Sequence, residues 1–109
     1  MAQFDVHINT GPSREAIPFV VIIQSSIFDN YGRRLVAPLV RKELLPKPAF
    51  STDQRTFPEF QVGEIKLVLN PLEIVSVPVD RLGATVTSLA DSGQTISDAI
   101  DEVLTRSWG

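Results

Sequence analysis

The side chains that most often perform catalysis or bind metals are scarce in this sequence. Its 109 residues include one histidine, His7, and no cysteine. A zinc site needs about four ligands, usually cysteine or histidine, and the acidic residues form no tight cluster with ligand spacing. We therefore expect no metal and no cofactor. The lack of cysteine also excludes disulfides and thiol chemistry, which suits a reducing cytoplasm.

Motifs for nucleophilic catalysis and phosphate binding are also missing. A serine–histidine–acid relay is formally possible, but nothing in the sequence places His7 beside a serine, and GxSxG is absent. Neither GxGxxG nor GxxxxGK(S/T) occurs. We expect His7 to be a solvated or satisfied histidine on the polar face of a strand, where it is free to contact a partner.

Two short segments flank a predicted turn at residues 29–32 and could contact a partner. Ser25, Ile27 and Phe28 precede the turn, and exposed apolar residues beside a turn often form a contact surface. Packing beneath the long loop expected at residues 41–58 is an equal alternative for them. Arg33 and Arg34 follow the turn, and their spacing favours a solvated strand end over a site for carboxylates or phosphates.

Apolar patterns predict the strands that must position these residues. Alternation indicates a half-buried strand, whereas a short, continuous, β-branched segment indicates a strand buried on both faces. Pro38 cannot donate to a ladder and should mark an edge or a strand end. A brief helical turn is expected at residues 41–45, within a long loop. The expected strands are residues 3–8, 17–24, 33–40, 59–62, 64–70 and 73–79, with a hairpin about Gly63.

The last part of the sequence changes to helical spacing. Asp91 followed by Gln94 is a weak capping-box signal for a helix start. Ile100, Leu104 and Trp108 then recur at i, i+4 and i+8 and share one helical face. The tryptophan could close the core or anchor a partner, because aromatic residues are enriched in interfaces.

Composition fits a single domain over residues 1–109, mainly β in an α+β arrangement. The net charge of −3 makes nucleic acid a poor first choice of partner. No apolar segment approaches the roughly 18 residues needed to span a membrane, and the first residues lack the order of a signal peptide. We expect a cytoplasmic protein-binding module that is not an enzyme.

Three collinear segments resemble the CcdB family of plasmid and chromosomal toxins. QSSIFDNYGRRLVAPL resembles the family's QS-x-I turn and GRR-x-V-x-PL pattern, and MAQFDVH resembles its first strand. The segment that begins SVPV resembles a strand followed by a loop and a helix ending near Trp-Gly. The resemblance implies a small SH3-like barrel of antiparallel strands with a C-terminal α-helix, the fold shared by CcdB and MazF toxins.

The resemblance also implies the toxin of a type II toxin–antitoxin system. Such a toxin binds the DNA gyrase A subunit and traps the gyrase–DNA cleavage complex, acting as a topoisomerase poison by binding alone. A homodimer is implied, neutralised by a CcdA-like antitoxin, with transcription autoregulation and DNA contact only through the antitoxin complex. The gyrase-binding positions carried over are Gln3, Phe4, His7, Ser25, Ile27, Phe28, Asp101, Trp108 and Gly109.

Two other functions stay open. One is a MazF-like endoribonuclease in which Arg33 or Arg34 contacts RNA. The other is a non-toxic CcdB homologue kept for antitoxin binding and operon autoregulation. The tail motivates the second, because the family pattern ends in Trp-Gly-Ile or a related Gly-Ile. Aligning residues 99–101 with the family helix places Trp108 almost one helical turn beyond the family tryptophan.

Overall fold

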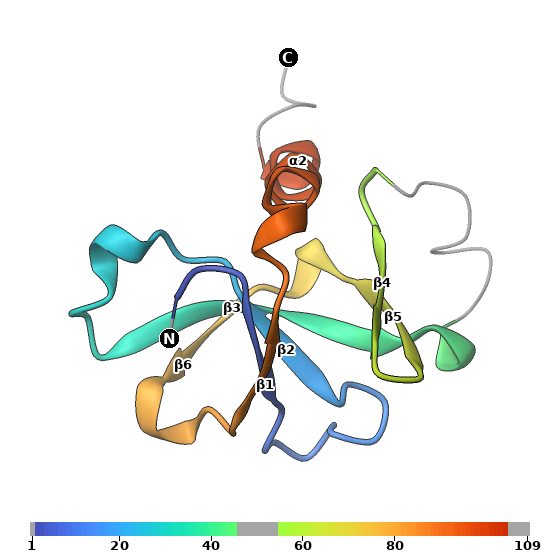
Figure 1. Cartoon of the computed structure of the whole chain (residues 1–109), viewed down its shortest axis with the longest axis horizontal. Helices are drawn as coiled ribbons and strands as arrows, with labels where there is room; N and C mark the ends of the chain where they lie inside the picture. Colours follow the sequence, from blue (N-terminus) through green and yellow to red (C-terminus); the bar gives the residue numbers. More distant parts are fainter. Residues whose placement is uncertain (1, 46–54, 105–109) are drawn as a thin grey trace.

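The computed structural model describes residues 2–45 and 55–104. In these residues, antiparallel strands form a curled half-barrel sheet in the order β4-β5-β3-β2-β1-β7, and β6 pairs with β3 (Figure 1). Helix α2 follows the last strand and lies over one face of the sheet. The elements are β1 Asp5–Ile8, β2 Phe19–Ile22, β3 Arg33–Arg41, β4 Glu59–Val62, β5 Ile65–Leu69, β6 Val75–Pro78, β7 Thr85–Ser88 and α2 Gly93–Leu104.

The main core lies between the sheet and α2. Strand register places Val6, Val21 and Ala37 side by side on one face, because residues opposite each other in paired strands share a face. Ile96 and Ala99 of α2 are fully buried in the same cluster. The next residues along β1 and β2, His7 and Val20, lie on the opposite face.

Strand β3 is the centre of the sheet, and Pro38 lies within it rather than at an edge or a strand end, so that prediction is wrong. One edge of β3 pairs with β2, while the other pairs with β6 up to Val36 and with β5 from Leu39. The Pro38 carbonyl accepts a hydrogen bond from Asn70 N at 3.1 Å on this second edge. Its missing N–H faces the same edge, where the strand partner changes, so no ladder bond is lost.

Several local predictions are confirmed. β4 and β5 form the predicted hairpin, with Gly63 at φ 60° in the left-handed region that favours glycine. A 3₁₀ turn, η2 (Lys42–Leu44), occupies the predicted helical turn.

The start of the C-terminal helix differs from the predicted one. Helix α2 begins at Gly93, two residues later than Asp91, and Gln94 donates to Asp98 Oδ1 instead of closing a capping box.

Strand β7 was not predicted, because its sequence carries no hydrophobic alternation. All four of its residues are exposed, and they are threonine, valine, threonine and serine. The strand is specified by its partner, since Thr87 lies opposite Val6 and Thr85 lies opposite His7. Tertiary pairing therefore determines this element where the local pattern does not.

Candidate protein-binding site

Three segments that are distant in sequence meet beside the start of α2. The Gln3 side-chain amide donates to the Ile23 carbonyl at 3.1 Å, and the Phe4 amide donates to the Ile22 carbonyl at 2.6 Å. A Cβ placed on Gly93 would lie 2.6 Å from Phe4 Cε2, so the phenyl ring covers the first turn of α2. The structure thus brings two predicted site residues, Gln3 and Phe4, next to the loop that follows β2.

That loop, residues 23–32, is called the η1 loop after its 3₁₀ turn η1 (Ser26–Phe28), and it projects at the left of Figure 1. Three apolar or aromatic side chains project from it into solvent. Ile27 is 81% exposed, Phe28 55% and Tyr31 64%. The alternative in which Ile27 and Phe28 pack beneath a loop is therefore wrong, and the prediction of an exposed apolar surface is confirmed. Sequence reasoning missed Tyr31, although the chain has only one tyrosine and it lies in the predicted turn.

Hydrogen bonds within the η1 loop brace its backbone. Ser25 caps η1 by accepting from Ile27 N at 3.4 Å, and its carbonyl accepts from Phe28 N at 3.0 Å. The Tyr31 amide donates to the Phe28 carbonyl at 2.9 Å. The Gln24 amide group donates to the carbonyls of Phe28 and Arg33 across the neck of the loop. The exposed side chains are therefore carried by a braced backbone.

Arg33 and Arg34 do not act as a pair, because they point to opposite sides of β3. Arg33 is exposed and donates from Nε to Ser76 Oγ at 2.8 Å. Arg34 is only 5% exposed and donates to the carbonyls of Asp29, Tyr31 and Arg33. The prediction of a solvated strand end is wrong for Arg34, and its burial also contradicts a role for it in contacting RNA.

His7 is buried, so the prediction that it lies on an exposed face is wrong. Its side chain is 1% exposed, and Nδ1 lies 2.8 Å from the Gly83 carbonyl oxygen. A carbonyl only accepts, so Nδ1 carries the proton, and Nε2 is buried without a hydrogen-bond partner among the described residues. Gly83 lies in the connection from β6 to β7, after η4 (Val79–Arg81), and strand alternation does not reveal a contact between residues so distant in sequence.

The end of α2 is where the remaining predicted residues lie. Asp101 is exposed on the helix, and Trp108 and Gly109 fall outside the described residues. Ile100 packs against the core, whereas Leu104, on the same helical face, is 65% exposed. The last described turn of α2 therefore extends past the core and presents an apolar side chain.

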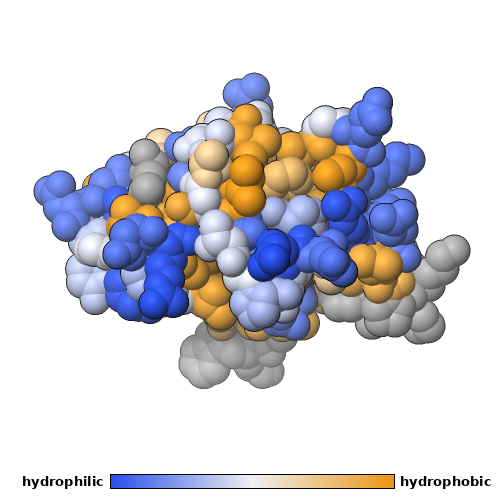
Figure 2. Space-filling view, turned by 90° about the horizontal axis from the view of Figure 1, so that it is seen from below, coloured by the Kyte–Doolittle hydropathy of each residue, from blue (hydrophilic) through white to orange (hydrophobic). Residues whose placement is uncertain are grey.

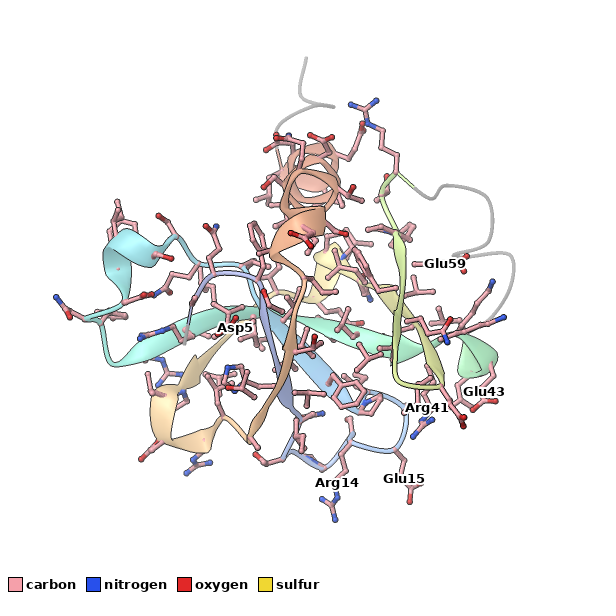
Figure 3. The ribbon with its side chains drawn as sticks, in the orientation of Figure 1. Asp5, Arg14, Glu15, Arg41, Glu43 and Glu59 are labelled. Atoms are coloured by element: carbon pink, nitrogen blue, oxygen red, sulfur yellow. The ribbon has the colours of Figure 1, made fainter. Side chains whose placement is uncertain are left out.

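Several charged side chains lie far from the η1 loop. Figure 3 shows Glu15, Arg41, Glu43 and Glu59 on the side of the molecule away from the η1 loop. Arg41 Nε donates to the Glu15 carbonyl at 2.8 Å. Within residues 2–45 and 55–104, no three histidine, aspartate or glutamate side chains are grouped so that they could hold a metal ion.

Figure 2 shows the molecule from below, with apolar surface bordered by hydrophilic residues. A hollow is lined by residues of the β1–β2 turn, β6 and η4. It opens between the β1–β2 turn and η4. Thr10 Oγ1 donates to the Arg81 carbonyl at 2.8 Å across this opening. The lining residues are Ile8, Asn9, Thr10, Gly11, Val20, Val77, Arg81 and Leu82.

Comparison with known proteins decides the family. The model of the CcdB protein family matches residues 3–106, almost the whole sequence. The chain belongs to the CcdB family of toxins. The half-barrel with its C-terminal helix is also found in a solved structure described as an endoribonuclease in complex with its cognate antitoxin, from a mycobacterial species. That structure superposes with a TM-score of 0.72 at 13% identity and covers 100% of this chain and 99% of that chain. At this identity the likeness concerns the fold.

None of the described helices has the length and apolar character needed to cross a membrane. The only α-helix among residues 2–45 and 55–104, α2, spans Gly93–Leu104 and packs Ile96, Ala99 and Ile100 in or against the core.

Proposed function

We propose that this CcdB-family chain is a toxin that binds the DNA gyrase A subunit and traps the gyrase–DNA cleavage complex in the cytoplasm. The observation that carries the proposal is the η1 loop. Its exposed Ile27 and Phe28 lie in the segment that resembles the family's QS-x-I turn. Exposed apolar side chains on a braced backbone are suited to protein recognition, because less conformational entropy is lost on binding.

The proposed gyrase surface combines the η1 loop with its neighbours. Gln3 and Phe4 lie beside the loop through their bonds to Ile23 and Ile22. Asp101 and the tail residues Trp108 and Gly109 complete the surface in the proposal, with Trp108 as an aromatic anchor. His7 is left out of this surface, since its side chain is buried.

Two further partners belong to the proposal. The chain forms a homodimer, so that each residue of the surface is presented twice to a two-fold symmetric target. A CcdA-like antitoxin neutralises the toxin, and the complex binds DNA through the antitoxin. The solved structure of similar fold, which is described as holding its cognate antitoxin, supports the antitoxin partner.

An endoribonuclease is the competing function, because the protein in that solved structure carries this name. Arg34 is buried against backbone carbonyls, and the Nδ1 atom of His7 is engaged with Gly83. General acid–base cleavage of RNA needs titratable groups within reach of the substrate. Arg33 is exposed, but its guanidinium donates to Ser76 Oγ and to the Ser76 carbonyl. We therefore favour a toxin that acts by binding.

The proposal is tested with purified gyrase, ATP, supercoiled plasmid and this protein. We expect linear DNA to accumulate after the trapped complexes are denatured. Incubation of the same preparation with total RNA should leave the RNA intact. RNA fragmentation without linear DNA would replace the proposal with the endoribonuclease function. If neither linear DNA nor RNA fragments form, the non-toxic homologue is the remaining function.

A further inference from the structure

The contacts of the η1 loop suggest a role for two residues that the family resemblance does not assign. Arg34 is the one buried arginine among the described residues, and its guanidinium points at main-chain carbonyls of the loop rather than at a carboxylate. Burying an unpaired charge is costly. An arginine retained in such a place needs a reason other than net electrostatic stabilisation.

The partners of Arg34 show what it holds. Nη2 donates to the Asp29 carbonyl, and Nη1 donates to the carbonyls of Tyr31 and Arg33. The Asp29 and Tyr31 carbonyls belong to the turn that directly follows η1, and Arg33 is the first residue of β3. The planar fork of the guanidinium therefore fixes several peptide groups together, which a lysine ammonium, as a point charge, cannot do in the same geometry.

Gln24 holds the same loop through a second set of hydrogen bonds, and it shares the Arg33 carbonyl with Arg34. Its amide nitrogen donates to the Phe28 carbonyl at 3.2 Å and to the Arg33 carbonyl at 3.3 Å, while its Oε1 accepts from Leu35 N at 3.2 Å. Gln24 and Arg34 thus bind the backbone from Phe28 to Arg33, directly after Ile27. The segment that carries Ile27 and Phe28 has few tertiary contacts of its own, since both side chains are largely exposed.

We infer that Arg34 and Gln24 are positioning residues that hold Ile27 and Phe28 in the conformation that binds the partner. This inference rests on the proposed function, because it concerns the same surface. Arg34 and Gln24 act through the backbone of the loop and need not touch the partner. Their loss should weaken binding by loosening the loop, so that its ordering is added to the cost of association.

The test compares Arg34→Lys and Gln24→Met with a core variant, Ile96→Val, that destabilises the protein away from the loop. Binding to purified gyrase A subunit is measured by calorimetry well below each melting temperature. Amide hydrogen exchange is followed at Phe28, Asp29 and Tyr31, whose N–H groups close the loop. We expect each loop variant to bind about tenfold more weakly and to exchange faster at these amides, whereas Ile96→Val should change neither.

The possible outcomes separate this inference from the proposed function. Wild-type affinity in both loop variants would overturn the positioning role and leave gyrase binding intact. If the wild type itself fails to bind, the proposed function fails. Amide hydrogen exchange in the η1 loop of the variants then tests the positioning role. Exchange at Phe28, Asp29 and Tyr31 no faster than in Ile96→Val would overturn it. If Arg34→Lys does not fold, Gln24→Met carries the same comparison.

Discussion

The phenyl ring of Phe4 rests on the backbone of Gly93, where a Cβ atom would come within 2.6 Å of Phe4 Cε2 and 3.0 Å of Phe4 Cδ2. The backbone of Phe4 is fixed at this contact by its conformation and by a hydrogen bond. Phe4 has a φ of 70°, uncommon for a residue with a side chain, and its carbonyl accepts from Leu89 N at 2.9 Å. The N-terminal segment is thereby joined to the start of α2.

Gly93→Ala should destabilise the protein by about 1–3 kcal/mol, because the new methyl group overpacks against Phe4. Urea unfolding measures the change. The control is Gly32→Ala, where a Cβ would meet nothing within 4 Å and stability should change little. Combining Gly93→Ala with Phe4→Ala should recover part of the loss, since the ring that clashes is gone. Additive losses in the double variant would contradict this contact.

His7→Ala should lower the free energy of unfolding by about 2–4 kcal/mol, through the lost hydrogen bond to Gly83 and the cavity left behind. At a temperature where the variant is folded, its affinity for the gyrase A subunit should equal that of the wild type. Chemical denaturation and calorimetry provide the two values. A stable variant with weak binding would instead place His7 in the interface.

Ile96→Ala should destabilise the fold by about 2–5 kcal/mol, because Ile96 is fully buried between α2 and the sheet. Leu104→Ala, at the exposed end of the same helix, should cost less than about 0.5 kcal/mol. Thermal unfolding of both variants distinguishes the sites. Equal losses would mean that the end of α2 is covered in solution, as a dimer interface would cover it.

Breaking the Lys42–Glu59 ion pair should have little effect on stability. The two charged groups are 2.8 Å apart, but both side chains are substantially exposed to solvent. Exposed pairs contribute roughly 0–1 kcal/mol. Glu59→Gln should therefore shift the free energy of unfolding by less than about 1 kcal/mol, and added salt should reduce the difference further. A larger, salt-independent loss would point to a structural role for Glu59 beyond the ion pair.

Much of the fold could be predicted from the sequence, because its strands and its helix differ in hydrophobic period. Strand alternation located Val6, and the turn residues located the hairpin at Gly63. The failures involve elements that contact each other across long sequence distances. His7 is buried and meets the Gly83 carbonyl, and Pro38 is accommodated where the partner of β3 changes. No local sequence pattern predicts the burial of His7 or the central position of Pro38.

The exposed residues of the candidate site could be predicted from the sequence, but the residues that hold its backbone could not. Ile27 and Phe28 were expected to form a contact surface because they lie beside a turn, and the structure leaves both exposed. The burial of Arg34 could not be predicted, because an arginine at a strand end is ordinarily solvated and its partners are main-chain carbonyls. Only the folded loop shows which peptide groups it holds.

The gyrase DNA cleavage assay, run with matched surface variants, tests the proposed toxin activity most directly. Ile27→Ser removes an exposed apolar side chain from the η1 loop. Leu72→Ser removes a side chain that is also well exposed, at 64%, from η3 (Pro71–Glu73) outside the η1 loop. We predict that wild type and Leu72→Ser produce linear DNA at the same protein concentration, whereas Ile27→Ser requires about tenfold more. No linear DNA with the wild type, or equal potency of all three proteins, would contradict gyrase poisoning through this loop.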